Sequence, residues 1–346
     1  MSMSLSAEQQ DRVTQLGAEA LIIDAMGGYI VAPEPPPYQG RNYLDRVADS
    51  NVRVTNITIA AHAEDFEHAL DKMFHYFNLF QVAKDRVVHI KSVADIERAH
   101  REKKVGVMFG FQSPTPIDIH INRWTIFRQL GLRTCSLAYN EPNVFAHGCH
   151  DPRNGGLSYY GLQAINEMNR LGIVVDLSHV GERSSLEAIE HSKKPCIFSH
   201  SNAKAVANTR RNITDEQAKL VASKGGVIGL SPHAFLSAKE TAAQPNLDDY
   251  LDHFDYLAKL VGTDHIGVGS DVFESYTKFS WETSTKLIYN SPWTYETVQN
   301  ADYNRVEGIH LLIAGLVSRG FSNAEITKFL GANFLRVFKQ VWRDDI

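Results

Sequence analysis

Two histidines and an aspartate each follow a short apolar segment of this sequence. His179 closes "DLSH", His200 closes "IFSH" and Asp271 closes "HIGVGSD". His179 and His200 are 21 residues apart, the length of one strand–helix–strand step, so we expect them on neighbouring strands. Imidazole nitrogens are good Zn²⁺ ligands, and a nearby carboxylate can hold or relay the proton of a metal-bound water. These residues therefore predict a catalytic site, although hydrogen-bonded histidines with no chemical role are the simpler alternative.

Other residues are weaker candidates. His147 and His150 have HxxH spacing in the loop "FAHGCHDPRNGG", where two ordinary surface histidines are the more common explanation. His233, in "LSPHAF", is a candidate pocket residue. Arg210 and Arg211 precede an expected helix start, a placement that suits either an anionic ligand or two solvated side chains.

Eight short apolar, β-branched segments alternate with helical patterns. This alternation predicts parallel strands, and eight of them favour a closed (β/α)8 barrel. The alternative is an open doubly wound sheet, but the first segment is not followed by GxGxxG spacing. The segments are 20–24, 52–60, 104–111, 133–140, 172–179, 195–200, 225–231 and 265–271.

Barrel active sites form at the carboxyl ends of the strands, so the residues there are the candidates. Gln112 ends the third segment, and Tyr139 and Asn140 end the fourth. The first segment, 20–24, leads in "ALIIDAMGGYI" to Met26 and Gly28, whose side chains carry almost no chemistry. We therefore ask why this strand end is bare.

The composition is that of an ordinary globular chain. Of the 346 residues, 43% are hydrophobic and 22% charged, and two helical patterns close the sequence. We expect one domain over 1–346 with a helical extension over about 300–346.

The formal net charge is −5, and the sequence contains no Lys/Arg cluster. Nucleic acid is therefore not an expected partner. No apolar run suits a signal peptide or a membrane span, and three scattered cysteines suit a reducing compartment, so we expect a cytoplasmic protein.

Several segments resemble the membrane (renal) dipeptidase family of metal-dependent amidohydrolases. They are "NEMNRLGIVVDLSHVG", "PCIFSHSNAKAVANTRRNITDEQ", "GGVIGLS", "LVGTDHIGVGSD" and "FLGANFLRVF". The resemblance runs from about Leu21 to the C-terminus and is densest over 157–271. It implies a (β/α)8 barrel, zinc-dependent hydrolysis of dipeptides and, often, a homodimer.

The resemblance also implies roles for single positions in this chain. It places two zinc-binding histidines at His179 and His200, a proton-handling aspartate at Asp271 and a carboxylate-binding arginine at Arg211. Four other family positions carry different residues here. The zinc-binding HxD pair falls on Met26 and Gly28, the glutamate that bridges two zinc ions on Gln112, and a carbonyl-polarising histidine on Tyr139.

A two-zinc site is therefore not expected. A neutral amide at Gln112 cannot bridge two divalent ions, and the Met26 thioether is poorly matched to zinc that activates water. Asp24 shares the strand parity of position 26 and is the one candidate substitute ligand. We expect at most one zinc ion on His179 and His200, or none.

The favoured function is a dipeptidase-like amidohydrolase acting on a small carboxylate-bearing substrate. Asp271 would act as general acid/base, Tyr139 and Gln112 would bond the reacting carbonyl, and Arg211 with Asn140 would bind the substrate. Two alternatives stay open. One is a metal-independent lyase or isomerase using the same histidines and aspartate, and the other is a non-catalytic binding protein. Aromatic residues of the C-terminal region would cover either a dimer interface or the mouth of the site: Trp281, Tyr289, Trp293 and Tyr295.

Overall fold

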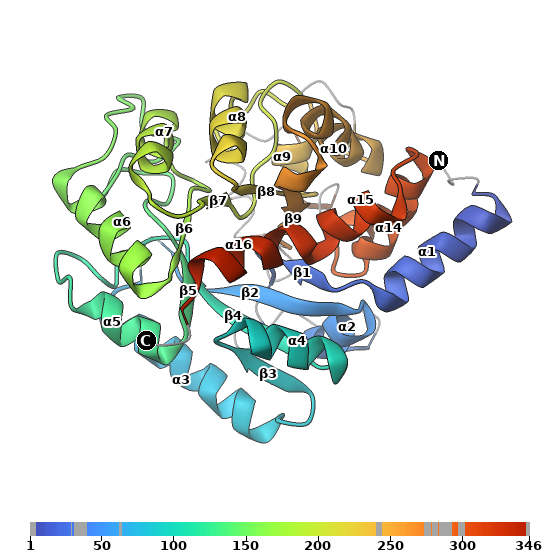
Figure 1. Cartoon of the computed structure of the whole chain (residues 1–346), viewed down its shortest axis with the longest axis horizontal. Helices are drawn as coiled ribbons and strands as arrows, with labels where there is room; N and C mark the ends of the chain where they lie inside the picture. The colour runs from blue at the N-terminus through green and yellow to red at the C-terminus, as the bar shows by residue number, and fades with distance from the viewer. Residues whose placement is uncertain are drawn as a thin grey trace.

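A closed ring of parallel strands forms the centre of the computed structural model (Figure 1), which describes residues 5–28, 30, 40–61, 64–239, 244–272, 278, 283, 293–296 and 302–343. The ring runs β1-β2-β4-β5-β6-β7-β8-β9 and closes where β9 pairs with β1 and β2 pairs with β4. The predicted eight-stranded barrel is confirmed. The strands are β1 (Ile22–Asp24), β2 (Val52–Ala60), β3 (Val87–Ile90), β4 (Val105–Phe111), β5 (Leu132–Ser136), β6 (Val174–Asp176), β7 (Ile197–Phe198), β8 (Val227–Leu230) and β9 (Ile266–Val268).

The sequence patterns did not predict the ninth strand, β3. It pairs with the first half of β4, at Val105–Met108, while β5 takes the second half of the same edge at Phe109–Phe111. Because β3 has only β4 as a neighbour, it lies outside the ring. A strand of four residues is too short for its alternation of apolar and polar side chains to be distinguished from a loop.

Helices surround the ring (Figure 1). Helices alternate with the strands of the ring, as the sequence patterns predict, and typical end signals bound several of them. Thr214 caps α8 in a reciprocal bond with Gln217, and Gly172 ends α6 with a φ of 68°. The helices are α1 (Ala7–Glu19), α2 (Tyr43–Asp49), α3 (Phe66–Val82), α4 (Val93–Arg101), α5 (Arg123–Leu130), α6 (Tyr159–Leu171), α7 (Glu182–His191), α8 (Asp215–Ser223), α9 (Ala234–Ser237), α10 (Leu247–Val261), α14 (Gly308–Ser318), α15 (Asn323–Thr327) and α16 (Asn333–Val341), with short turns η1 (Thr263–His265), η3 (Asp302–Asn304) and η4 (Lys328–Ala332).

The last helix, α16, packs against the barrel and shares its core. Phe334 and Phe338 lie in one buried cluster with residues of β1, β2, β4, β6, β7 and β8. The glycines of β8 and β9 make room for this contact, because a Cβ at Gly267 would lie 2.3 Å from the Phe334 ring. The C-terminal helix therefore completes the barrel core.

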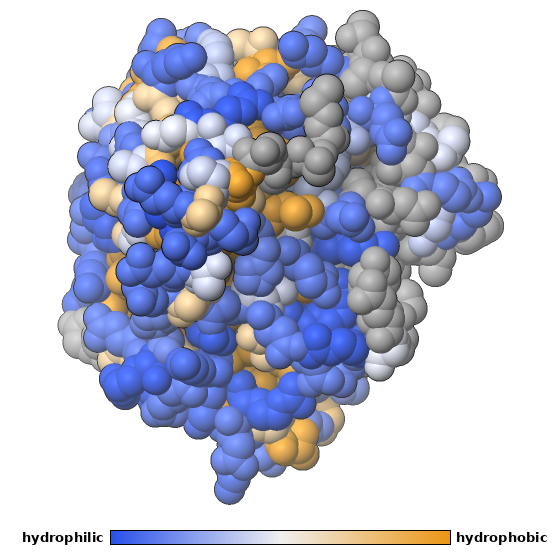
Figure 2. Space-filling view, turned by 90° about the vertical axis from the view of Figure 1, so that its right-hand side faces the viewer, coloured by the Kyte–Doolittle hydropathy of each residue, from blue (hydrophilic) through white to orange (hydrophobic). Residues whose placement is uncertain are grey.

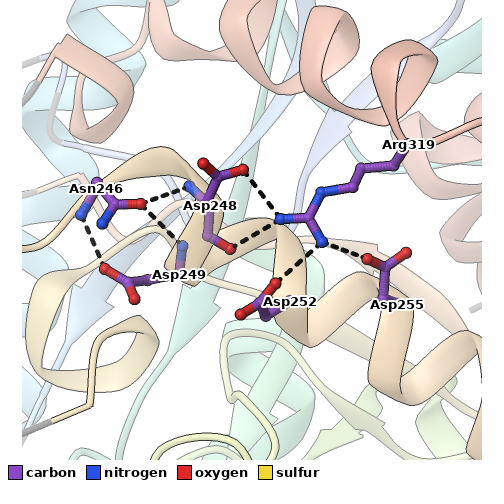
Figure 3. A network of polar contacts seen from close by, with 6 residues as sticks. All are labelled: Asn246, Asp248, Asp249, Asp252, Asp255 and Arg319. Atoms are coloured by element: carbon purple, nitrogen blue, oxygen red, sulfur yellow. Dashed lines mark hydrogen bonds and ion pairs between the residues drawn. The ribbon is translucent and has the colours of Figure 1, made fainter. Parts of the chain in front are cut away.

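An arginine at the end of α14 joins this helix to α10 (Figure 3). The guanidinium of Arg319 donates to Asp252 Oδ1 at 2.9 Å, to Asp255 Oδ2 at 2.5 Å and to Asp248 Oδ1 at 3.0 Å. The three carboxylates lie along one face of α10 at helical spacing, where they would repel one another without the cation.

Replacing this arginine tests its contribution to stability. Arg319→Ala is expected to lower the free energy of unfolding by roughly 1–2 kcal/mol, since losing the cation leaves three like charges on one helix face, of which Asp252 and Asp255 are partly buried. Urea denaturation at low salt and in 1 M NaCl measures this, and salt should shrink the difference. Arg98→Ala, which removes a cation paired with Asp95 alone, is the control and should cost at most about 0.5 kcal/mol. Equal midpoints for wild type and Arg319→Ala would contradict the prediction.

The surface in Figure 2 mixes hydrophilic residues with scattered hydrophobic ones. Among the helices that the structure describes, none combines the length and apolar character needed to cross a bilayer.

Candidate active site at the carboxyl ends of the barrel strands

His179 and His200 meet at the ends of neighbouring strands. β6 pairs with β7, and the two histidines follow these strands, as their spacing predicts. Their Nε2 atoms are 3.0 Å apart, and both side chains are buried. Two nitrogens that share a tetrahedral zinc at ordinary bond lengths lie about 3.3 Å apart, so a small separation of these rings would admit one ion.

The second nitrogen of His200 is held by a buried serine and aspartate. His200 Nδ1 is 2.7 Å from Ser199 Oγ, which donates its own proton to Asp176 Oδ2 at 2.5 Å. Because that hydroxyl has a single proton, its oxygen must accept from Nδ1–H of His200. Burial, aided by Arg211, lowers the pKa of His200 well below its usual value. The neutral ring therefore presents the Nε2 lone pair to His179.

His179 has two competing partners at its Nδ1 atom. Asn140 Oδ1 lies 2.7 Å away and would accept a proton from Nδ1, whereas Arg211 Nε lies 3.1 Å away and can only donate. With Asn140 as partner, His179 also presents an Nε2 lone pair, and the two facing lone pairs then require a cation between them. With Arg211 as partner, His179 Nε2–H donates to His200 Nε2 and no cation is needed. The tautomer of His179 thus separates a metal-binding state from a metal-free one.

Arg211 is a buried cation that the protein holds in place. Besides the Nε contact, Nη1 donates to Ser201 Oγ at 2.7 Å and Nη2 donates to the His200 carbonyl oxygen at 2.8 Å. These bonds use three of the five guanidinium N–H groups, so two remain for a ligand.

Asp271 follows β9 in a left-handed backbone conformation, with a φ of 49°. Its backbone N–H donates to the Met26 carbonyl oxygen at 2.6 Å. Burial raises the pKa of the Asp271 carboxyl to about 7; the Arg211 cation opposes this effect and the Asp24 carboxylate adds to it. A carboxyl with this pKa can both take up and release a proton near neutral pH.

The end of β1 is filled by side chains that bond one another. Gln112 Nε2 donates to Thr58 Oγ1 at 2.7 Å and approaches Met26 Sδ at 3.6 Å, while Thr58 Oγ1 is 3.3 Å from the same sulfur. At these positions the family resemblance implies metal ligands that this chain lacks, and the structure has this closed cluster.

A tyrosine occupies the space that a side chain at position 28 would need. Tyr43 is buried, its hydroxyl accepts from Gly28 N–H at 3.1 Å, and a Cβ at Gly28 would lie 2.7 Å from Tyr43 Oη and 2.8 Å from Cζ. The aspartate of an HxD pair would therefore require the buried Tyr43 ring to shift.

Asp24, the candidate substitute ligand, ties β1 to β9. Oδ1 accepts from Ser270 N–H at 2.8 Å and from Met26 N–H at 3.2 Å, and Oδ2 accepts from the Ser270 hydroxyl. Burial raises the pKa of Asp24 to about 6 against these hydrogen bonds. Its oxygens are thus engaged in holding two strand ends together.

The remaining predicted residues lie around this centre. The half-buried Tyr139 ring stacks on His179 with centroids 4.1 Å apart. His233 is buried against Phe235, and Trp293 packs in one cluster with that phenylalanine and other residues of α9. Trp281 and Tyr289 lie outside the described residues. His147 bonds Asp151 at 2.5 Å, and burial with Arg211 and Arg210 lowers the pKa of His150 to about 4.

The described strand ends offer two imidazole donors that suit zinc. No group of three or more His, Cys, Asp or Glu side chains able to hold a metal occurs among the described residues. The two Nε2 atoms are imidazole donors, and each ring is oriented by a hydrogen bond at its Nδ1 atom, as in most zinc-binding histidines. Beside Met26 and Gln112, by contrast, the structure describes a thioether and an amide, which do not suit a second zinc.

Sequence reasoning missed four residues that shape the site. Asp176 and Ser199 stand inside the "DLSH" and "FSH" patterns, so a search for partners of the ring nitrogens could have found them. Thr58 and Tyr43 gave no signal, because they meet Gln112 and Gly28 only in the folded chain.

Sequence comparison identifies relatives of this chain. The family model for membrane dipeptidase (peptidase family M19) matches residues 39–287. An uncharacterized dipeptidase of Schizosaccharomyces pombe is 31% identical over 242 residues, which are 68% of this chain and 53% of that protein. A dipeptidase of Claviceps purpurea is 28% identical over 265 residues, 76% of this chain and 57% of that protein. The chain spans little more than half the length of these curated relatives.

Solved structures agree on the fold. An amidohydrolase from Pseudomonas aeruginosa superposes with a TM-score of 0.84 at 29% identity, covering 95% of this chain and 99% of that one. A metallopeptidase from Rhodobacter sphaeroides, liganded with a phosphinate mimic of the dipeptide L-Ala-D-Ala, gives 0.79 at 21% identity, covering 94% and 100%; at that identity the likeness concerns the fold alone. The match of the family model over most of the sequence shows that the chain belongs to the membrane dipeptidase family, peptidase family M19.

Proposed function

We propose that the protein is a dipeptidase-like amidohydrolase that uses a single zinc ion and acts on a small carboxylate-bearing substrate. The observation that supports it most is the pair of buried Nε2 atoms, 3.0 Å apart, whose rings are oriented by Asn140 and Ser199. His179 and His200 would hold the ion. When bound, zinc would lower the pKa of a water molecule and polarise the amide carbonyl.

Asp271 is proposed as the general acid/base. Its buried carboxyl, with a pKa of about 7, would take a proton from the attacking water and return it to the leaving amine. Tyr139, stacked on His179, would donate a hydrogen bond to the reacting carbonyl oxygen, and Gln112 would join it on release from Thr58 Oγ1 and Met26 Sδ. A donor so placed stabilises the negative charge that develops on this oxygen.

Arg211 is proposed to bind the substrate carboxylate through its two remaining N–H groups. Its bonds to Ser201 Oγ and to the His200 carbonyl oxygen, which do not depend on the His179 tautomer, fix the guanidinium before substrate arrives, so little side-chain entropy is lost on binding. In this proposal Asn140 is a positioning residue, since its amide oxygen is 2.7 Å from His179 Nδ1.

A second candidate is metal-independent acid–base chemistry, such as a lyase or isomerase step, in the same pocket. The 3.1 Å contact between Arg211 Nε and His179 Nδ1 favours it, because this tautomer lets the two histidines bond each other without a cation. His179, His200 and Asp271 would then exchange protons directly with substrate.

Metal content distinguishes the two candidates. Protein purified without a metal-affinity tag and dialysed against metal-free buffer, then equilibrated with zinc and dialysed again, is expected to hold about one equivalent. The His179→Ala/His200→Ala variant should hold none. His68→Ala/His75→Ala, which removes two exposed histidines of α3, is the matched control and should bind as wild type does. Two equivalents in the wild type would contradict the single-zinc site, and none would overturn the metallohydrolase proposal.

Activity gives the second half of the test. Dipeptide hydrolysis that stops with a chelator and returns with zinc supports the hydrolase. Turnover that resists the chelator would support metal-independent chemistry instead.

A further inference from the structure

A polar cavity of about 320 Å³ has Arg211 in its wall. Its walls are the loop 148–154, the residues after β6 at 179–182, and the segment after β7 that includes Lys204 and 210–214. Among the residues that line it, His179 and Arg211 belong to the candidate active site, so the cavity adjoins that site directly. Its volume is at the lower end for small-molecule pockets, which suits one small acidic group and its linker.

The charges on the cavity wall are mainly positive. Lys204, Arg210 and Arg211 line it, and none of the ion pairs formed among the described residues includes Lys204 or Arg210. Of the two acidic residues on the wall, Asp151 is already bound by Arg153 at 3.0 Å and by His147. Glu182 is the remaining acid. An anion would therefore meet three cations and one uncompensated carboxylate.

Backbone bonds hold these walls together. Gly148 bridges Val180, and Cys149 N–H donates to the His179 carbonyl oxygen at 2.8 Å. On the opposite wall, the Lys204 backbone N–H donates to the Ile213 carbonyl oxygen at 2.8 Å. Because both walls are tied to the strand ends, the cations are presented without a large rearrangement on binding.

We propose that this cavity is a second oxyanion subsite, in which Lys204 and Arg210 bind a further acidic group on the substrate half that Arg211 anchors. The inference rests on the proposed function and adds a substrate class, namely amides whose carboxyl-terminal residue carries an acidic side chain. A carboxylate on Arg211 and a second one against Lys204 and Arg210 would explain why one cavity gathers three cations. Free inorganic phosphate offers the same chemistry, so the test separates a substrate group from a free anion.

Binding of small probes to metal-free protein tests the subsite independently of catalysis. Calorimetric titration with glutarate, a dicarboxylate, is compared with acetate and with inorganic phosphate. The Lys204→Gln/Arg210→Gln variant is expected to bind glutarate at least about tenfold more weakly than wild type, because each cation makes a charge-assisted hydrogen bond. Lys219→Gln, on the exposed side of α8, removes one cation outside the cavity and should change nothing.

The kinetic arm compares Ala-Glu with Ala-Ala in the zinc-loaded enzyme. The ratio of their kcat/KM values should fall about tenfold in the double variant and stay constant in Lys219→Gln. Equal glutarate affinity in wild type and double variant overturns the subsite. Phosphate binding that depends on Lys204 and Arg210, with an unchanged kinetic ratio, would assign the cavity to a free anion and overturn the substrate proposal. If no dipeptide is hydrolysed but glutarate still binds more weakly to the double variant than to the wild type, the proposed function is overturned and the subsite is supported.

Discussion

The triple variant Met26→His/Gly28→Asp/Gln112→Glu is expected to bind no more zinc than the wild type. Although it introduces the ligands that the family resemblance implies for a two-zinc site, a Cβ at position 28 would lie 2.7 Å from the buried Tyr43 hydroxyl. The new aspartate would clash with the tyrosine ring before it reached a metal. Adding Tyr43→Ala removes that ring, and the quadruple variant should bind one further equivalent.

Elemental analysis after equilibrium dialysis measures the difference, with circular dichroism to show that each variant is folded. Tyr43→Ala alone is the control; it should keep the wild-type zinc content and lose about 3 kcal/mol of stability from the vacated ring. A triple variant that already gains an equivalent would show that Tyr43 does not exclude the ligand. A folded quadruple variant that gains nothing would contradict our interpretation of this strand end.

Asp271→Asn is expected to lower kcat/KM by about 10²–10⁴-fold, the usual range for loss of a general acid or base. The wild type should show kcat/KM rising with pH through about 7, because the buried carboxyl is protonated below this pKa and cannot accept a proton there. The variant should lack this rise. Asparagine tolerates the left-handed backbone of position 271, so the local fold should persist.

Stability provides a readout that is separate from turnover. The pKa of Asp271 is higher in the folded state than in the unfolded state, so its protonated form stabilises the fold at low pH and this contribution is lost as pH rises from about 4 to about 7. Thermal unfolding of Asp271→Asn should therefore change less over this range than that of the wild type. Asp118→Asn, at another left-handed aspartate position, is the matched control and should leave both profiles unchanged. A variant that keeps the rise of kcat/KM near pH 7 would remove Asp271 from the acid–base role.

The barrel was largely predictable because its signals are local. Apolar segments, glycine helix ends and the capping pattern at Thr214 each depend on a few neighbouring residues. The same local spacing predicted that His179 and His200 follow adjacent strands. By contrast, β3 was missed, since four residues on the β4 edge carry no distinct period.

The sequence by itself determined the fold class and which side chains stand at the strand ends. Only the tertiary structure decided how those side chains are used, because the decisive contacts join residues far apart in the chain. Asn140 and Arg211 converge on one nitrogen of His179 from different loops. Tyr43 fills the space beside Gly28 from the start of α2. The spacing of residues in the sequence cannot predict these contacts, because they form only when the ring of strands closes and brings its carboxyl ends together.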